Sequence, residues 1–343
     1  MTGVRDNTML DSSPRTRALK LIGTPSLAVF STLLFAVMTQ PTIATAAENA
    51  MEYAIAIHGG AGSDPAGWSA EEREEREKTL REALTLGHNL LAKGASSLDA
   101  VEQVIRVLED HPLFNAGRGA VLNADGDAEL DASIMDGRDK SCGAVAAVRR
   151  VKNPISLARL VMSSTRHILL AGDGAERFAA QMQVELVEPE YFRVSRGPDG
   201  SSRKGSSLIG TVGCVALDRR GNLAAGTSTG GLKGKMVGRV GDSPIIAAGT
   251  YADNATCAVS GTGIGEQFIR HAVAYDISAR MAYREASLEE AVHVQLFERL
   301  RPGDGGIIAV DRNGAISMQF STAGMPRAAA DSTGRFEVRL GRE

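Results

Sequence analysis

Residues 210–230 read Gly-Thr-Val-Gly-Cys-Val-Ala-Leu-Asp-Arg-Arg-Gly-Asn-Leu-Ala-Ala-Gly-Thr-Ser-Thr-Gly, and this stretch predicts a β-hairpin. Small apolar residues alternate on both sides of a turn at 218–222, where Gly221 is free to adopt a positive φ. A hairpin of this length places Thr211, which opens the first strand, beside Thr229, which closes the second. Gly210 directly precedes the first threonine.

A threonine hydroxyl is a poor nucleophile unless a base lies beside it. One solution is to cut the chain before the threonine, so that its own freed α-amine becomes that base. Gly210 suits such a cut, because it has no Cβ to obstruct attack on its carbonyl and it tolerates a strained backbone. Thr211 is therefore a candidate N-terminal nucleophile. The alternative is an ordinary hairpin whose threonines serve strand propensity.

A second nucleophile must be weighed in the same stretch. Residues 226–230 match G-x-S-x-G, the nucleophile elbow of α/β-hydrolases, with Ser228 at its centre and His271 or His293 as a possible base. That motif requires a helix immediately afterwards. Residues 231–239 contain three glycines and are a poor helix start, so the elbow ranks below Thr211.

The composition favours a packed, layered core and argues against two classes of function. Hydrophobic residues make up 43% of the 343 residues, glycine is abundant (38) and aromatic residues are sparse (4%). The net charge of −3 comes without a basic patch, which argues against a nucleic-acid partner. The six histidines show no H-E-x-x-H spacing, so a catalytic zinc site is not expected.

The first 46 residues have the features of an export signal. Basic residues precede the largely apolar segment 21–37, and Ala44-Thr45-Ala46 matches a signal-peptide cleavage site. Removing this segment leaves a chain of net charge −5. The alternative is an uncleaved membrane anchor, for which the apolar segment is short and broken. We therefore expect export, most simply to a bacterial periplasm.

The remainder, residues 47–343, is expected to form one α+β domain. Residues 193–210 are rich in Ser, Gly, Arg and Lys and read as a flexible linker that ends at the candidate cut. Strands and helices occur in clusters, which favours two antiparallel sheets with helices outside them. Strands are predicted at 53–58, 130–134, 142–148, 167–170, 256–260, 306–311 and 315–320, and helices at 68–93, 96–108, 154–162, 175–182, 266–275 and 288–300.

Two further groups of residues point to a binding site. Arg239 and Asp242 lie three residues apart, and they form either a surface ion pair or a pocket that holds a carboxylate and an ammonium. The Gly-rich segment 261–265 reads either as a phosphate loop or as an oxyanion hole made by the Thr262 hydroxyl and one N–H. Glu266 disfavours the phosphate loop, because an acidic side chain would meet the phosphate.

Taken together, these motifs resemble the isoaspartyl peptidase/L-asparaginase family, the plant-type asparaginases among the N-terminal-nucleophile hydrolases. The resemblance implies an αββα four-layer sandwich and a precursor cut between Gly210 and Thr211. Residues 47–210 would then be an α subunit and residues 211–343 a β subunit, and two such pairs would form a dimer. The matching segments are His58–Gly62, Phe114–Gly117, Leu130–Ala132 with Met135–Gly137, Gly210–Gly213, Thr227–Gly231, Gly238–Pro244 and Gly261–Gly263.

The resemblance also assigns roles to individual residues. Thr211 resembles the nucleophile, with its free amine as general base, and Thr229 the residue that positions that amine and assists cleavage. Asn115 is similar to the asparagine beside the nucleophile. Thr262 and Gly263 resemble the oxyanion hole. The substrate residues by the same comparison are Arg239 for the α-carboxylate, Asp242 for the α-ammonium, and Gly265, with Thr262 and Gly263 also lining the pocket.

No cofactor is implied for catalysis. The family holds a structural sodium ion through backbone oxygens, which correspond here to Leu108, Glu109, His111, Phe114, Ala116 and Arg118. The implied reaction is hydrolysis of β-aspartyl dipeptides and L-asparagine, with release of L-aspartate from an acyl-enzyme on Thr211. Two alternatives remain: a glycosylasparaginase, and an amino-acid-binding protein without enzymatic activity in which Gly210–Thr211 is never cut.

Overall fold

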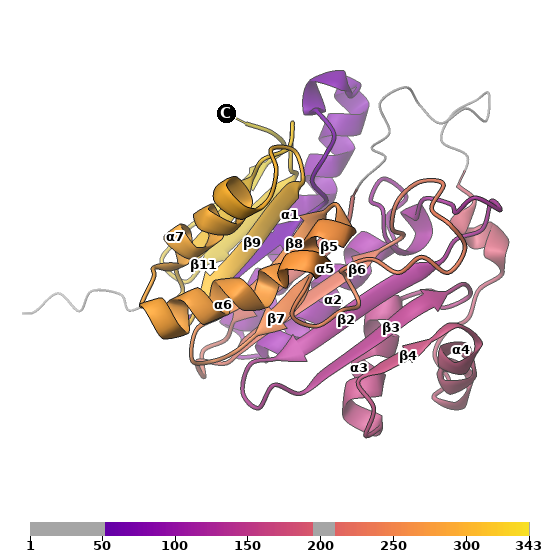
Figure 1. Cartoon of the computed structure of the whole chain (residues 1–343), viewed down its shortest axis with the longest axis horizontal. Helices are drawn as coiled ribbons and strands as arrows, with labels where there is room; N and C mark the ends of the chain where they lie inside the picture. Colours follow the sequence, from indigo (N-terminus) through magenta and orange to yellow (C-terminus); the bar gives the residue numbers. More distant parts are fainter. Residues whose placement is uncertain (1–51, 195–209, 343) are drawn as a thin grey trace, which may run out of the picture. The chain divides into compact units, whose positions relative to one another are not determined.

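The predicted hairpin lies at the centre of an eight-stranded sheet in the computed structural model (Figure 1), which describes residues 52–194 and 210–342. The strand order is β12-β11-β1-β5-β6-β2-β3-β4. The hairpin is β5–β6, with Val212 opposite Ser228, so Thr211 and Thr229 lie side by side as predicted. The strands are β1 (Ala54–His58), β2 (Leu130–Asp136), β3 (Cys142–Val148), β4 (Leu169–Ala171), β5 (Val212–Leu217), β6 (Leu223–Thr229), β11 (Arg327–Asp331) and β12 (Phe336–Arg339).

A second, four-stranded sheet faces the first. Its order is β10-β9-β8-β7, and all its pairings are antiparallel. Between the two sheets lies one apolar cluster, to which β1 contributes Ala54 and Ala56, β5 contributes Val215 and Leu217, and β6 contributes Leu223 and Ala225. Small side chains here let the sheets approach closely. The strands are β7 (Thr250–Ala252), β8 (Cys257–Gly263), β9 (Gly305–Asp311) and β10 (Ile316–Phe320).

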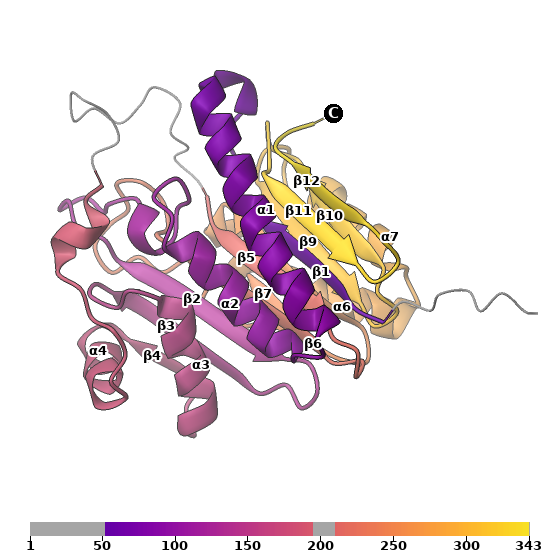
Figure 2. The same ribbon diagram turned by 180° about the vertical axis from the view of Figure 1, so that it is seen from behind.

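Helices cover the outer face of each sheet (Figures 1 and 2). Helices α1 (Ala70–Ala92), α2 (Ser97–Glu109) and α3 (Pro154–Ser164) lie over the larger sheet, and α5 (Gly265–His271), α6 (Val273–Arg284) and α7 (Leu288–His293) over the smaller one. Ser69, Ser96 and Ser287 cap α1, α2 and α7 through their side chains. The mixed α+β class predicted from the sequence is confirmed. The remaining helices are α4 (Gly172–Gln181), the 3₁₀ turns Pro65–Gly67, Gly117–Gly119 and Pro189–Phe192, and a π-helix at Val294–Arg299.

Three details of the sequence prediction are wrong. β4 pairs with β3 in parallel, because α3 returns the chain to the same end of the sheet. The helix expected through Tyr275 breaks at Ala272 (φ 46°), where the Ala274 and Tyr275 amides bond loop carbonyls instead of the preceding turn. The helix expected at 288–300 changes into the π-helix after His293.

The segment 1–46, expected to be an export signal, and most of the expected linker 193–210 lie outside the described residues. Residues 52–194 and 210–342 belong to one compact unit, Glu48–Glu343. Within that unit, none of the described helices combines the length and apolar character that a membrane crossing requires.

Candidate active site

The open end of the hairpin brings two threonine hydroxyls to one peptide bond. The Gly210–Thr211 peptide is intact, and Thr211 Oγ1 lies 2.7 Å from the Gly210 carbonyl oxygen and 3.1 Å from Thr229 Oγ1. Thr229 donates its own hydrogen to the same carbonyl at 3.1 Å and accepts from the Gly231 amide at 2.9 Å. Thr211 and Thr229 are 5% and 2% exposed, so this polar cluster is shielded from bulk water.

Asn115 donates a further hydrogen bond to the Gly210 carbonyl. Its Nδ2 lies 2.8 Å from that oxygen and 2.7 Å from the Gly231 carbonyl oxygen. The amide is held in this orientation because its Oδ1 accepts from the Val121 N–H at 2.8 Å. The Gly210 carbonyl thus accepts from Asn115 as well as from the two threonines, an arrangement that stabilises negative charge on its oxygen.

The loop after β1 covers the same peptide bond. Gly60 has a φ of +107°, and a Cβ at this position would lie 3.0 Å from Gly210 Cα and 3.0 Å from Thr211 N. Only glycine fits here, because a side chain would be strained and would collide with backbone atoms. The next residue, Ala61, donates its amide to Thr262 Oγ1 at 3.0 Å, which places the β8 threonine beside this loop.

Thr262 and Gly263 end β8 at the same edge of the molecule. Thr262 is fully buried, and because its oxygen accepts from Ala61, its hydroxyl hydrogen can point elsewhere. Gly263 has a φ of +157°, and a Cβ there would lie 2.0 Å from the Asp304 carbonyl oxygen. Only glycine fits at this tight crossing of two chain segments.

Arg239 and Asp242 do not form an ion pair with each other. The Arg239 guanidinium binds the Glu266 carboxylate with two hydrogen bonds of 3.0 Å. Asp242 is 5% exposed, and its Oδ2 has no hydrogen-bond partner among the described residues. Burial raises the pKa of Asp242 to about 7. A buried carboxyl with one unpartnered oxygen beside an arginine suits a ligand that carries both an ammonium and a carboxylate.

Gly265 explains how the Gly-rich loop meets this pair. A Cβ at Gly265 would lie 2.8 Å from Arg239 Nη2 and 2.8 Å from Asp242 Oδ1, so the first turn of α5 packs directly on both side chains. Glu266 then reaches Arg239. Since an acidic side chain occupies this helix start, the phosphate-loop interpretation is wrong.

The nucleophile-elbow interpretation is also wrong. Ser228 lies inside β6 with no exposed surface, and its hydroxyl donates to Glu109 Oε1 at 2.6 Å instead of to a histidine. The Ile155 amide donates to the same oxygen at 3.0 Å, and burial raises the pKa of Glu109 to about 8. His271 and His293 are exposed at the ends of α5 and α7.

Replacement of Ser228 by alanine is therefore expected to leave the activity within about tenfold of the parent. The change removes one hydrogen bond to a buried carboxyl, which costs about 1–3 kcal/mol of unfolding free energy. Steady-state assays with thermal unfolding would measure both effects. If the Ser228→Ala protein were folded but inactive, Ser228 would again be a candidate nucleophile.

The expected sodium loop runs from the end of α2 to the 3₁₀ turn at 117–119. A Cβ at Gly117 would lie 2.4 Å from the Glu109 carbonyl oxygen, and one at Gly119 would lie 2.0 Å from that of Phe114. Glycines thus let this turn fold tightly over carbonyl oxygens, the ligands that hard cations prefer. In the described part of the chain, no cluster of three or more His, Cys, Asp or Glu side chains suits a metal ion.

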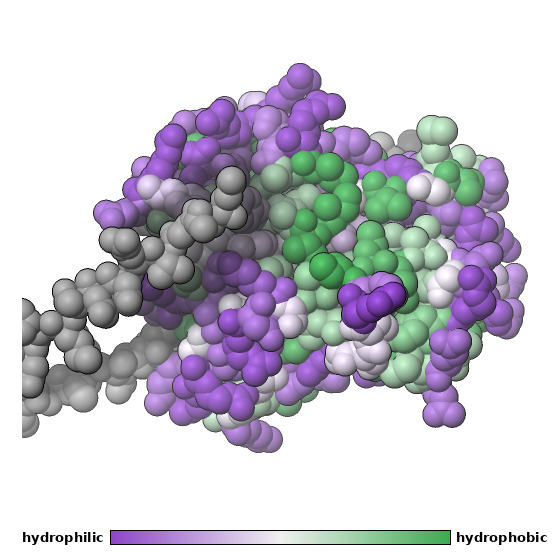
Figure 3. Space-filling model, turned by 60° about the horizontal axis from the view of Figure 1, so that its bottom comes forward, coloured by the Kyte–Doolittle hydropathy of each residue, from purple (hydrophilic) through white to green (hydrophobic). Residues whose placement is uncertain are grey.

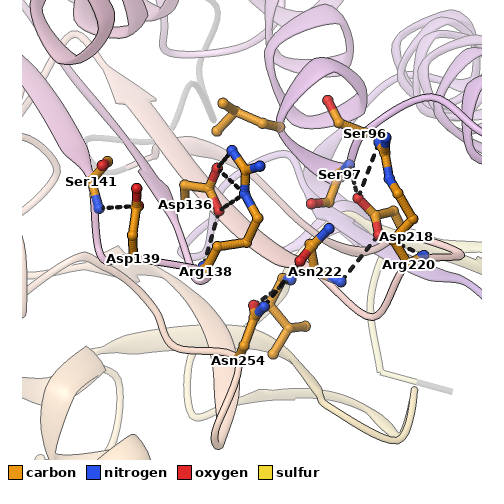
Figure 4. Close-up of polar contacts among 12 residues, drawn as sticks. Ser96, Ser97, Asp136, Arg138, Asp139, Ser141, Asp218, Arg220, Asn222 and Asn254 are labelled. Carbon is orange, nitrogen blue, oxygen red and sulfur yellow. Dashed lines mark hydrogen bonds and ion pairs between the residues drawn. The ribbon is translucent and has the colours of Figure 1, made fainter.

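A separate polar crevice of about 320 Å³ lies at the turn end of the hairpin, away from the threonines (Figure 4). Asp218 accepts from the Ser97 amide at 3.1 Å, and Asp136 binds Arg138 at 2.6 Å. These carboxylates are already occupied by partners within the chain. The bond from the Ser97 amide to Asp218 anchors the turn of the hairpin to the start of α2.

Sequence reasoning missed the contacts of His58 and Gly60. The His58 ring nitrogens lie 2.9 Å from the Thr211 carbonyl oxygen and 3.0 Å from Ser260 Oγ, and burial lowers the pKa of His58 to about 3. The available signal was the His-Gly-Gly run directly after a buried strand. That run indicated that the backbone approaches another group closely, but it did not show that this group is the Gly210–Thr211 peptide.

The chain is similar in sequence to known proteins along most of its length. The asparaginase family model matches residues 51–199 and 196–340. The chain is 46% identical over 293 residues to isoaspartyl peptidase of Escherichia coli K12, covering 80% of this chain and 91% of that protein. It is 44% identical over 322 residues to a probable isoaspartyl peptidase/L-asparaginase 2 of Arabidopsis thaliana, covering 84% and 98%. Isoaspartyl peptidase/L-asparaginase of mouse is 44% identical over 289 residues, covering 80% and 87%.

Proposed function

The chain belongs to the asparaginase family, and on that premise we propose that it is a self-processing threonine amidohydrolase that cleaves β-aspartyl dipeptides and L-asparagine. The observation that carries the proposal is the Gly210 carbonyl, which lies 2.7 Å from Thr211 Oγ1 and accepts hydrogen bonds from Asn115 and Thr229. The same threonine would serve first in processing and then in turnover.

In processing, Thr211 Oγ1 attacks the Gly210 carbonyl carbon. Asn115 and Thr229 stabilise the negative charge that develops on the carbonyl oxygen, since both already donate to it. The C–N bond breaks, the acyl group moves to the hydroxyl oxygen, and water hydrolyses the resulting ester. The cut frees the Thr211 α-amine, which then acts as the general base.

In turnover, the substrate would be held by its α-carboxylate and α-ammonium. Arg239 is suited to the carboxylate, because a planar guanidinium binds it with two hydrogen bonds. Asp242 is suited to the ammonium, which would satisfy its unpartnered Oδ2. Thr211 Oγ1 attacks the side-chain carbonyl, and Thr262 with Gly263 stabilises the oxyanion. The amine leaves, and water releases L-aspartate from the acyl-enzyme.

The decisive experiment is a denaturing gel of the purified protein, with N-terminal sequencing of any smaller fragment. A fragment that begins Thr-Val-Gly-Cys supports processing before Thr211. Assays on a β-aspartyl dipeptide, L-asparagine and an N-glycosylated asparagine would then define the substrate. An uncut, inactive chain that still binds L-aspartate would favour the amino-acid-binding alternative.

Binding of L-aspartate is expected to release protons at acidic pH. Asp242 has a pKa of about 7 without ligand, so at pH 6 it is mostly protonated, whereas an ammonium partner requires the carboxylate. We therefore expect close to one proton released per ligand at pH 6 and almost none at pH 8.5. Calorimetry in buffers of different ionisation enthalpy measures this number. Equal release at both pH values would remove Asp242 as the ammonium ligand.

We also propose the αββα four-layer sandwich of N-terminal-nucleophile hydrolases, and a dimer of α/β pairs. Two facing sheets with helices outside support the sandwich. One observation that supports the dimer is the group of apolar residues across the middle of one face (Figure 3). A second is the exposure of Ile168 and Leu169, near the β4 edge, whose side chains are 55% and 47% exposed. Light scattering of the processed protein would give the mass of the assembly.

A structural sodium ion is proposed for the 108–118 loop. The carbonyl oxygens of Leu108, Glu109, His111, Phe114, Ala116 and Arg118 would hold it, and it would fix the loop that contains Asn115. We expect a higher melting temperature in sodium chloride than in choline chloride of equal ionic strength. Equal melting temperatures would argue against the ion.

Export remains a proposal that rests on residues 1–46. The supporting features are the basic start, the apolar segment and the Ala-Thr-Ala sequence. Fractionation of cells that express the full chain, followed by N-terminal sequencing, tests it. A cytoplasmic protein that retains its first residues would contradict export.

A further inference from the structure

A line of buried polar side chains crosses the otherwise apolar space between the two sheets. It begins at His58 at the end of β1 and continues through Ser260 on β8, Thr227 on β6 and Thr250 on β7. Each of these residues has no exposed surface. The line ends at Ser133 on β2, whose Oγ lies 2.6 Å from the Ser243 carbonyl oxygen. It therefore connects the nucleophile with the residue that follows Asp242.

The direction of the hydrogen bonds follows from the His58 end. A carbonyl oxygen only accepts, so the 2.9 Å contact with the Thr211 carbonyl requires the proton on His58 Nδ1. A neutral imidazole then presents a lone pair at Nε2, and Ser260 must donate its hydrogen there, across 3.0 Å. Burial keeps this ring neutral by holding its pKa near 3.

The same reasoning orders the next hydroxyls. Because Ser260 donates its only hydrogen to His58, its oxygen accepts a hydrogen bond from Thr227 at 2.7 Å. Thr227 in turn accepts from Thr250 at 2.6 Å. Ser133 Oγ lies 2.8 Å from Thr250 Oγ1 and 2.6 Å from the Ser243 carbonyl oxygen, and its one hydrogen goes to the carbonyl, which can only accept. The hydrogens of Ser260, Thr227 and Thr250 therefore all point toward His58, as expected for an ordered buried polar network.

Gly213 on β5 leaves the space that this line needs. A Cβ at Gly213 would lie 2.1 Å from Ser260 Oγ and 2.4 Å from His58 Nε2. Any side chain here would displace the hydrogen bond between them. The glycine two residues after Thr211 is therefore explained by the contact between His58 and Ser260.

We propose that His58 is a positioning residue that fixes the Thr211 carbonyl before and after chain cleavage, and that the hydroxyl line of Ser260, Thr227 and Thr250 holds His58 in the required tautomer. The inference rests on the proposed function, since it assigns a role to residues around its nucleophile. After the cut, Thr211 loses its covalent link to Gly210. Its backbone is then held by β5 and by this carbonyl contact, so the contact matters most in the mature enzyme.

A matched pair of variants tests the contact. Asparagine places an N–H close to the position of His58 Nδ1, and leucine has nearly the same shape without a donor. Both changes leave Ser260 without its acceptor, so their difference isolates the bond to Thr211. We expect His58→Asn to exceed His58→Leu in kcat by about ten- to a hundredfold, the effect of leaving one buried carbonyl unpaired. The KM should be the same in both, because His58 does not contact Arg239 or Asp242. His88→Leu, on α1, serves as a control and should keep the kcat of the parent.

A second measurement needs neither activity nor a variant. ¹⁵N NMR of the histidine-labelled parent protein should show His58 protonated at Nδ1 and unprotonated at Nε2 between pH 5 and pH 9. Equal kcat values for His58→Asn and His58→Leu, or a proton found on Nε2, would overturn the proposal. If His58→Leu does not fold, the NMR result decides. If the parent lacks amidase activity, the proposed function fails, and the tautomer is still measured.

Discussion

Replacing Thr211 with alanine is expected to give a single uncut chain without measurable amidase activity. The change removes the oxygen that lies 2.7 Å from the Gly210 carbonyl oxygen, and with it the attacking group for both processing and turnover. Loss of a hydroxyl nucleophile commonly lowers kcat on the order of 10⁶-fold. A denaturing gel and a turnover assay on the same preparation would record both effects.

Thr211→Ser is the matched control for that experiment. Serine keeps the hydroxyl and, after a cut, the free amine, so this variant should still be processed and active. If Thr211→Ala were cut between residues 210 and 211, another group would have to perform the attack. If Thr211→Ala stayed uncut but remained active, Thr211 would serve processing alone.

Replacing Arg239 with leucine is expected to lower kcat/KM by about 10²- to 10³-fold and to leave processing intact. The guanidinium is the proposed partner of the substrate α-carboxylate, and removing one member of a buried charge pair costs about 3–5 kcal/mol. Processing involves Gly210, Asn115 and Thr229, which Arg239 does not contact by any hydrogen bond in the described structure.

Lys233→Leu controls for the lost positive charge. Lys233 lies in the same loop and is exposed, so its removal changes the net charge equally without touching the pocket. This variant should keep kcat/KM within a factor of about two to three, as surface changes usually do. A comparable loss in both variants would point to long-range attraction of the substrate instead of direct binding by Arg239.

The parts of the fold that were predicted from the sequence are those with local signals. The β5–β6 hairpin could be predicted because alternation and the turn at 218–222 lie within one short stretch. Strand β11 was missed because Ala328–Ala330 has weak strand propensity and becomes a strand through pairing with β1. The parallel β3–β4 pair was missed for a similar reason, since strand direction depends on how α3 crosses the sheet.

In the candidate site, too, residues with a local sequence signal could be predicted and residues that depend on distant contacts could not. Thr211 and Thr229 follow from the hairpin register, and the roles of Asn115 and Arg239 came from resemblance to a family. The contact of His58 with Thr211 could not be predicted, because it depends on β1 lying beside β5, with His58 opposite Gly213. A histidine in a buried strand carries no local sign of its partner.

The strand order has a consequence for how a cut, mature protein would unfold and refold. In the large sheet, β1 lies between β11 and β5, and β2 pairs with β6, so strands from before residue 210 pair with strands from after it at three places. A cut at that position would leave two polypeptides whose separation requires three strand pairings to break. Unfolding would then also be dissociation, and recovery of the native state would depend on protein concentration. The precursor folds as one molecule, whereas the mature enzyme would have to reassemble from two.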